Sequence, residues 1–242
     1  MSLAVSSVFN AFVQRLDEGK IACSIYLDLA KVFDTADHII LLSKLERHGV
    51  RGLPLQLIKS YLTNRYQRTV VDSLESNEKL VTCRVPHGST LGPFLFLVYI
   101  NDLALASEFN VRMFADDTSL TMDSDNYLSL QTKVNCEINK IDKWLKSNKL
   151  SLNYNKTEYM IVTIKKENFN FRINIGGHEI SQKECISYLG VMFDDSFTWK
   201  QHIVSRKLSN GCWALSQISK YSNSQMVKKC ILQCFIHIFN VV

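Results

Sequence analysis

The hydrophobic pattern opens with residues 21–29 (IACSIYLDL), a nearly continuous apolar run that carries one charge, Asp28, near its end. A strand that is buried on both faces has this composition. Amphipathic spacing then predicts two helices, over residues 37–48 and 53–62, and Gly49 stops the first of them. This part of the chain therefore places a carboxylate where a buried strand gives way to helices.

The pattern of the next segment alternates short strands with a longer apolar run. Residues 66–71 and 79–85 are strand-like, and residues 94–103 (FLFLVYINDL) are long enough for a buried helix. Residues 111–122 (VRMFADDTSLTM) divide into two short apolar stretches around the pair Asp116-Asp117. This division predicts a tight β-hairpin with both carboxylates at its tip.

The remaining chain continues the mixture of helices and strands. Apolar residues recur at intervals of three and four over residues 127–145, which predicts a helix. A hairpin turning on residues 176–177 (Gly-Gly) and a single strand over residues 187–193 are expected next. After Asp195 the pattern becomes helical again, and this shift is the one candidate domain boundary.

Composition narrows the class of protein only a little. The chain has 242 residues, 46% of them hydrophobic, which is enough to bury the core of one large domain. The net charge of +5 permits a polyanionic partner without requiring one. Seven scattered cysteines without a C-x-x-C motif favour a reducing, intracellular compartment over secretion. The longest apolar runs are shorter than the ~18–20 residues that span a bilayer, so no membrane partner is expected.

Asp28 and the pair Asp116-Asp117 are the candidate site of chemistry. Two carboxylates about 4 Å apart repel each other by roughly 4 kcal/mol at an effective dielectric of 20, so a sheltered pair takes up a proton or a cation. A third carboxylate favours the cation, and oxygen-only ligands favour Mg²⁺ or Mn²⁺ over zinc. Two such ions can hold the attacking and leaving oxygens of a phosphoryl transfer. The alternative stays open that the Asp pair is only a turn, because Asp is a favoured turn residue.

Five sequence blocks follow one another across most of residues 20–200: YLDLAKVFDTADHIILLSKLERHGV (26–50), VPHGSTLGPFLFLVYINDL (85–103), MFADDTSL (113–120), NKLSLNYNKTEYM (148–160) and SYLGVMFDDSFTW (187–199). Together they resemble the successive palm motifs of reverse transcriptases from jockey-like non-LTR retrotransposons. The resemblance implies an α+β polymerase palm with an antiparallel sheet and helices on one face, similar to a ferredoxin-like split βαβ core. The palm would cover residues 1–195 with its fingers largely missing, and residues 196–242 would form a short, partial thumb-like helical segment.

The resemblance implies an RNA-directed DNA polymerase that uses two Mg²⁺ ions, with Mn²⁺ possible, to join a dNTP to a primer 3′-hydroxyl. Asp28, Asp116 and Asp117 would be the catalytic and metal-binding residues, which agrees with the separate argument from charge. Lys156 matches the position of a lysine that protonates the leaving pyrophosphate, and its alternative is a solvated turn lysine. The implied partners are an RNA template, a DNA primer and the dNTP.

Other positions match family residues that handle the nucleotide and the strands. Phe33 would pack under the incoming sugar, unless it is simply a core residue. His87 stands where the family has Gln, which changes the reach of that side chain. The remaining matches are Gly88 for the nucleotide, and Pro86, Ser89, Tyr188, Leu189 and Gly190 for primer and template. Arg65 and Arg68, interleaved with aromatic residues, also suit a nucleic-acid strand, although an ordinary solvated face explains them as well.

Only 27 residues precede Asp28, so the chain resembles a truncated copy or a fragment that lacks upstream fingers and an endonuclease domain. Weak or absent polymerase activity is therefore expected, in a chain whose family works in the nucleus. The alternatives are a non-catalytic nucleic-acid-binding remnant of a retrotransposon and, less well matched to the motifs, another Mg²⁺-dependent phosphotransferase.

Overall fold

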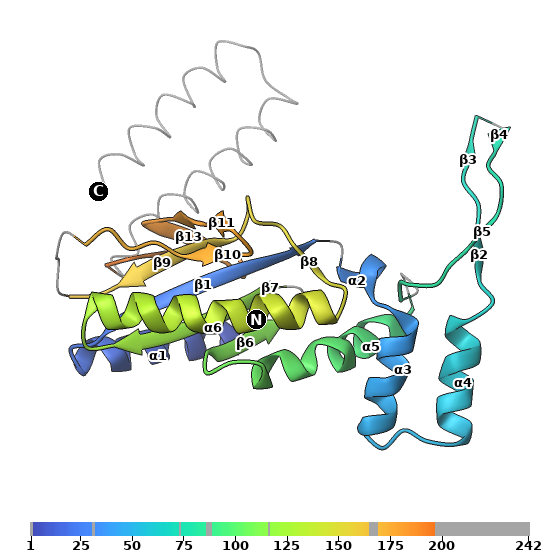
Figure 1. Cartoon of the computed structure of the whole chain (residues 1–242), viewed down its shortest axis with the longest axis horizontal. Helices are drawn as coiled ribbons and strands as arrows, with labels where there is room; N and C mark the ends of the chain where they lie inside the picture. Colours follow the sequence, from blue (N-terminus) through green and yellow to red (C-terminus); the bar gives the residue numbers. More distant parts are fainter. Residues whose placement is uncertain are drawn as a thin grey trace, which may run out of the picture.

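The computed structural model describes residues 2–30, 32–72, 74–85, 89–115, 117–164 and 169–196. A mixed sheet forms its centre (Figure 1). Its strands run in the order β12-β9-β1-β7-β6, and β8 pairs with the end of β1. The strand bounds are β1 Ile21–Ala30, β6 Asn110–Phe114, β7 Asp117–Ser124, β8 Ser151–Leu152, β9 Glu158–Val162 and β12 Ser181–Gln182.

The four main strands have the topology of a split βαβ fold. β1 is central and pairs antiparallel with β7 and β9, and β6 forms an antiparallel hairpin with β7. The connection from β1 to β6 passes through helices α2 to α5, and helix α6 connects β7 to β9. This arrangement agrees with the ferredoxin-like split βαβ core that the sequence predicted.

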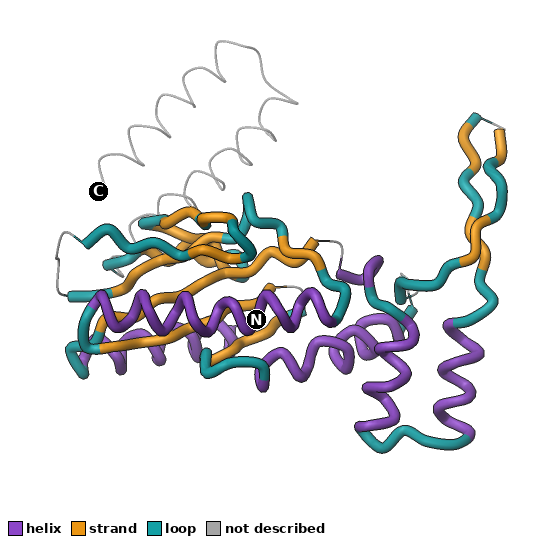
Figure 2. Tube along the Cα trace, in the orientation of Figure 1, coloured by secondary structure: helices purple, strands orange, loops and turns teal. Residues whose placement is uncertain are grey.

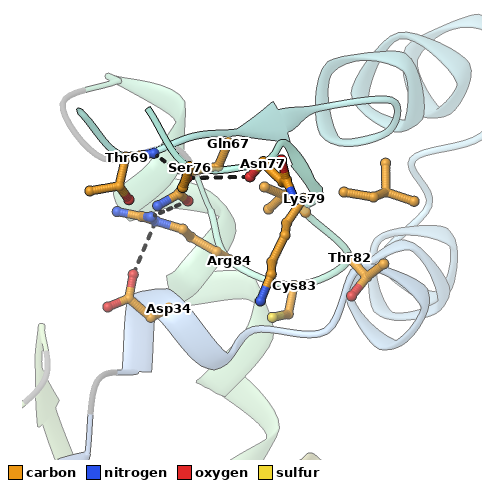
Figure 3. A pocket seen from close by; sticks show the side chains of 11 residues that line it. Asp34, Gln67, Thr69, Ser76, Asn77, Lys79, Thr82, Cys83 and Arg84 are labelled. Atoms are coloured by element: carbon orange, nitrogen blue, oxygen red, sulfur yellow. Dashed lines mark hydrogen bonds and ion pairs between the residues drawn. The ribbon is translucent and has the colours of Figure 1, made fainter. Parts of the chain in front are cut away.

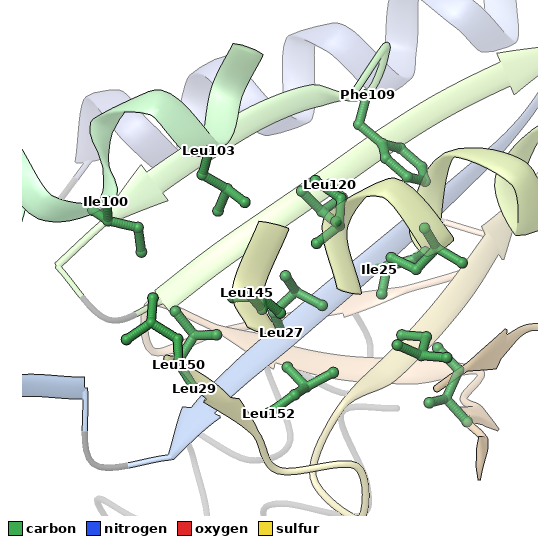
Figure 4. Close-up of a cluster of buried hydrophobic side chains, with 14 of the residues drawn as sticks. Ile25, Leu27, Leu29, Ile100, Leu103, Phe109, Leu120, Leu145, Leu150 and Leu152 are labelled. Atoms are coloured by element: carbon green, nitrogen blue, oxygen red, sulfur yellow. The ribbon is translucent and has the colours of Figure 1, made fainter. Parts of the chain in front are cut away.

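Two buried clusters cover the two faces of β1, because side chains alternate along a strand. Ile25, Leu27 and Leu29 point to the larger cluster, which α5 (Leu91–Ile100) and α6 (Tyr127–Ser147) complete (Figure 4). The expectation of a strand buried on both faces is therefore confirmed.

The opposite face carries a helix that the hydrophobic pattern did not predict. Helix α1 (Ser2–Asp17) places Val8 and Phe12 in a second cluster with Tyr26 and with the hairpin of β13 and β14. This helix adds to the predicted palm, whose helices were expected on one face only. Residues 187–193 were also predicted as one strand, which is wrong. The chain turns back there between β13 (Cys185–Tyr188) and β14 (Val191–Asp194).

Side-chain caps mark the start of helices α3 and α6. The Asp37 side chain accepts hydrogen bonds from the N–H groups of Ile39 and Ile40 at the start of α3 (His38–Arg47). Asn126 accepts from Ser129 in the same way at the start of α6. The helices predicted over residues 37–48 and 127–145 are thus confirmed to within two residues at each end.

The segment between α4 and α5 extends away from the body as an arm, here defined as residues 64–85 (Figures 1 and 2). The strands predicted over 66–71 and 79–85 are present only as short pieces in which β2 pairs with β5 and β3 with β4. The remaining bounds are α2 Val32–Thr35, α4 Leu53–Leu62, β2 Tyr66–Gln67, β3 Val70–Val71, β4 Leu74–Glu75, β5 Lys79–Leu80, η1 Asn101–Leu105, β10 Asn174–Ile175 and β11 His178–Glu179.

Two further predictions concern the C-terminal third of the chain. The hairpin expected around residues 176–177 is confirmed, since β10 and β11 pair across it. The helical segment predicted over residues 196–242 lies outside the described residues except for Ser196. Within the described ranges, no helix combines the length and apolar character needed to cross a membrane.

Candidate active site

Asp28 and Asp117 face each other across the two central strands. They are Cα partners in the antiparallel ladder of β1 and β7, so their side chains leave the same face of the sheet. Asp28 is half-buried and Asp117 is exposed. Asp116, the third predicted carboxylate, lies outside the described residues. The structure thus brings together two of the three predicted acidic residues.

The hairpin tip that carries Asp117 is strained. Phe114 and Asp117 are the last paired residues of β6 and β7, which leaves a two-residue turn. Ala115 in that turn has φ +56°, in the left-handed region that side chains other than Gly, Asn and Asp rarely adopt. Two-residue hairpin turns require this backbone form, and Asp117 is the first residue of β7 after the turn.

The main chain of Asp28 is held by the turn that leads into β9. Its N–H donates to the hydroxyl of Thr157 (3.4 Å), and its carbonyl accepts from the N–H of Asn153 (2.9 Å). The Thr157 hydroxyl is buried and donates in turn to the carbonyl of Asn153 (2.9 Å). Lys156 belongs to this turn, so the same hydrogen bonds fix the predicted lysine relative to Asp28.

A pocket of ≈ 200 Å³ joins these groups. It is lined by Tyr26, Leu27, Asp28, Asp117, Thr118, Lys156, Glu158, Ile186, Ser187 and Tyr188. Four residues predicted from separate motifs therefore meet in one cavity. Glu158 and Ser187 were not predicted as site residues. Glu158 is the Cα partner of Tyr26, so its position followed only from the register of β9 against β1.

Strand β13 supplies one wall of this pocket through Ile186, Ser187 and Tyr188. Tyr188 packs on Tyr26, with ring centroids 5.2 Å apart. Burial raises the pKa of Tyr188 and raises the pKa of Tyr26 to about 12, so both phenols stay protonated at neutral pH. Leu189 (φ +51°) and Gly190 (φ +74°) form the two-residue turn beside it. Tyr188 thus lines the pocket, while Leu189 and Gly190 turn the chain next to it.

Other predicted residues lie elsewhere. Arg65 and Arg68 belong to the arm, and Arg68 forms an exposed ion pair with Glu75 (2.8 Å). Ser89 accepts a hydrogen bond from the N–H of Gly92 at the start of α5 (3.0 Å). Pro86, His87 and Gly88 lie outside the described residues, and so does the side chain of Phe33.

The donor set of the pocket suits a hard divalent cation. Its acidic groups offer only oxygen atoms, and carboxylates opposite each other on a sheet destabilise it unless a cation lies between them. Asp28 and Asp117 could hold such an ion, with Glu158 at the rim of the same pocket. Among the described residues no group of three His, Cys, Asp or Glu side chains is arranged to hold a metal.

Comparison with known proteins gives consistent matches. The family model described as "Reverse transcriptase (RNA-dependent DNA polymerase)" matches residues 6–193. The chain is 27% identical over 241 residues to the RNA-directed DNA polymerase from mobile element jockey of Drosophila funebris, covering 93% of this chain and 26% of that protein. It is 28% identical over 231 residues to the probable RNA-directed DNA polymerase from transposon X-element of Drosophila melanogaster, covering 90% and 25%.

The chain spans about a quarter of the length of these curated relatives. Among solved structures, telomerase from Candida tropicalis in complex with a TWJ fragment of telomeric RNA matches with a TM-score of 0.53. The match has 10% identity and covers 98% of this chain and 41% of that chain. At this identity the likeness bears on the fold alone, and it confirms the predicted α+β palm.

Proposed function

Since the chain belongs to the reverse transcriptase (RNA-dependent DNA polymerase) family, we propose that it is the polymerase domain of a mobile element. Its reaction would be nucleotidyl transfer from a dNTP to a primer 3′-hydroxyl on an RNA template. The observation that carries this proposal is the pairing of Asp28 with Asp117, with Lys156 lining the same pocket. Motifs far apart in the sequence converge there on the groups that phosphoryl transfer needs.

Asp28 and Asp117, together with Asp116, would bind two Mg²⁺ ions, or Mn²⁺. When bound, the ions supply positive charge to the attacking and leaving oxygens of the in-line displacement. The two carboxylates project from paired strands, and the main chain of Asp28 is held by Asn153 and Thr157. Such rigid placement is what a positioned reaction requires, because small displacements of reacting groups lower the rate strongly.

Lys156 would donate the proton that the leaving pyrophosphate takes up. A lysine ammonium group carries three N–H donors, and the turn of Lys156 is fixed to Asp28 by hydrogen bonds. Tyr188, with the turn at Leu189 and Gly190, would support the primer end, because this hairpin forms the wall of the pocket next to the carboxylates.

The other predicted contacts are proposed on the sequence match. Phe33, His87 and Gly88 would contact the nucleotide, and Pro86 and Ser89 the template. Arg65 and Arg68 would contact the backbone of a strand that follows the arm. We propose the nucleus as the place of this reaction.

We also propose that the chain alone extends primers weakly or not at all. Lys156 is the single cation among the described residues that line the pocket, against three carboxylates. A dNTP triphosphate would find few positive groups there, so binding would depend on the metal ions and on whatever further basic residues approach the site.

Primer extension on an RNA template annealed to a DNA primer tests the function. We expect slow, Mg²⁺-dependent incorporation of dNTP that is lost in Asp28→Asn and Asp117→Asn. The matched control is Asp125→Asn, which removes an exposed carboxylate that makes no ion pair with the described residues. If nucleic acid binds equally well without Mg²⁺ and no incorporation occurs at any enzyme concentration, a non-catalytic binding remnant is the better description.

A further inference from the structure

Arg84 has a backbone conformation that does not suit its side chain. Its φ is +90°, in the left-handed region that glycine adopts freely and other residues avoid. It lies at the base of the arm, two residues before Pro86. Because glycine would remove the strain, an arginine at this position needs interactions that compensate for it.

Four interactions hold Arg84: three come from the segment of residues 34–38, and one comes from β2 of the arm. The main-chain N–H donates to the carbonyl of Ala36 (2.8 Å), and the Arg84 carbonyl contacts Nε2 of His38 (2.9 Å). The guanidinium Nε lies 3.0 Å from Oδ1 of Asp34, and Nη1 donates to Oε1 of Gln67 (3.1 Å) (Figure 3). The residue is therefore fixed by both its main chain and its side chain.

These contacts connect the arm to the segment that follows the strand of Asp28. Asp34 lies in α2, which follows the strand of Asp28, and Gln67 lies in β2 of the arm. A β-bridge between Asp37 and Cys83 reinforces the same junction. Arg84 thus ties the arm to the chain that leaves the catalytic strand, immediately before the loop that is proposed to contact the template.

A pocket of ≈ 740 Å³ lies at this junction, between the arm and α2 (Figure 3). Its lining includes the polar side chains of Arg84, Lys79, Gln67 and Asn77, and among the described residues Lys79 has no ion-pair partner. The side chain of Arg84 therefore borders an open, partly cationic surface and is not packed in a core.

We infer that Arg84 is a positioning residue that holds the arm in the orientation in which it binds a nucleic-acid strand. This inference rests on the proposed polymerase function and deepens it. A bound strand that follows the arm reaches the carboxylates only if the arm has the right angle to β1. We call the contacts of Arg84 with Asp34, Ala36, His38 and Gln67 the clamp. With the clamp in place the arm is already ordered, so a nucleic-acid strand does not have to order it on binding.

Three variants separate the effect of the Arg84 side-chain contacts from the effect of the backbone strain. Arg84→Gly removes the ion pair and the hydrogen bond to Gln67 while it relieves the strain at φ +90°. Arg84→Ala removes the same contacts and keeps the strain, and Arg84→Lys keeps the charge. If loss of the clamp leaves about a tenth of the molecules with the arm correctly placed, the apparent Kd for a strand rises about tenfold.

Binding is measured by fluorescence anisotropy with a labelled RNA–DNA template–primer. We expect Arg84→Gly to keep the thermal midpoint of the original chain and to bind about tenfold more weakly. We expect Arg84→Ala to bind as weakly and to melt earlier, and Arg84→Lys to regain part of the affinity. In primer extension the KM for template–primer would rise in Arg84→Gly while kcat stays nearly unchanged, which a general loss of structure would not produce.

A second readout does not depend on polymerase activity. Spin labels attached through an unnatural amino acid at Asn77 on the arm and Lys133 on α6 report the arm's orientation by pulsed electron paramagnetic resonance. We expect a narrow distance distribution in the original chain and a broad one in Arg84→Gly.

If the distribution and the affinity are both unchanged in Arg84→Gly, the inference is wrong. If the arm is released but template–primer binds neither protein, Arg84 does fix the arm and the proposed polymerase function fails. If the arm is released and affinity is unchanged, the link to strand binding is refuted.

Discussion

The opposed carboxylates lead to a prediction about stability that can be tested without any substrate. Cα partners in an antiparallel ladder have Cβ atoms about 4.5–5.5 Å apart. At about 5 Å, two charges repel by about 3 kcal/mol at an effective dielectric of 20 and by about 0.8 kcal/mol in water. Asp28 is half-buried and Asp117 exposed, so solvent screens the pair and the lower part of this range applies. We expect Asp117→Asn to raise the free energy of unfolding by about 1 kcal/mol when no divalent cation is present.

Mg²⁺ should reverse this order. An ion that binds only the folded chain adds about 1.4 kcal/mol at ten times its Kd. The original chain would gain this energy, while Asp117→Asn, which lacks a ligand, would not. For a chain of this size 1 kcal/mol corresponds to about 2–4 °C in Tm.

The assay is thermal unfolding in EDTA and in millimolar MgCl₂. Asp125→Asn is the matched control, since it removes the same charge from a site with no opposing carboxylate, and its Tm should stay nearly constant in both buffers. A lower Tm of Asp117→Asn in EDTA would refute the electrostatic reasoning. Equal stabilisation of both proteins by Mg²⁺ would place the ion elsewhere.

Three further substitutions test the hydrogen bond to the main chain of Asp28, the turn at Ala115, and a buried lysine away from the site. Thr157→Val leaves the N–H of Asp28 without its acceptor, so kcat in primer extension should fall at least tenfold. Thr157→Ser should restore kcat. If Thr157→Val and the original chain have equal rates, the hydroxyl does not matter. Ala115→Gly relieves the strain of a left-handed backbone, so the urea midpoint should rise by an amount equivalent to about 0.5–1 kcal/mol at constant m-value. A lower urea midpoint would contradict the assigned strain. Lys44→Met removes an ammonium group that is 2.6 Å from Asp102 and lies over aromatic rings. This substitution should destabilise the chain by about 2 kcal/mol in the same assay. An unchanged urea midpoint would show that the ion pair contributes little.

Much of the palm was readable from the order of hydrophobic residues. The run over residues 21–29 predicted a doubly buried strand, and the spacing over residues 127–145 predicted α6, because both patterns reflect local periodicity. Helix α1 was not predicted, and what holds it is the packing of Val8 and Phe12 on the opposite face of β1, which local periodicity does not specify. The turn at Leu189 and Gly190 was missed because an apolar residue in a left-handed turn looks like the middle of a strand.

Individual residues of the site were predictable from the sequence, but their arrangement in space was not. The charge argument and the motif resemblance both singled out Asp28 and Asp117. Their face-to-face placement depends on strand register, and a shift of one residue would have pointed one of them to the opposite side of the sheet. Glu158 was not predicted for the same reason. The clamp at Arg84 was hidden because it depends on a backbone angle and on contacts with three separate segments.

The hydrogen bond between Asp28 and Thr157 joins residues 129 positions apart. Such a contact forms only after most of the intervening polypeptide has collapsed around β1, and closing so long a loop is slow compared with local helix formation. A ribosome that has released only the first hundred residues of this chain has made Asp28 but neither Asp117 nor Thr157. Premature termination anywhere before β9 would therefore yield a product that lacks chemistry and exposes an unpaired edge of β1 to aggregation.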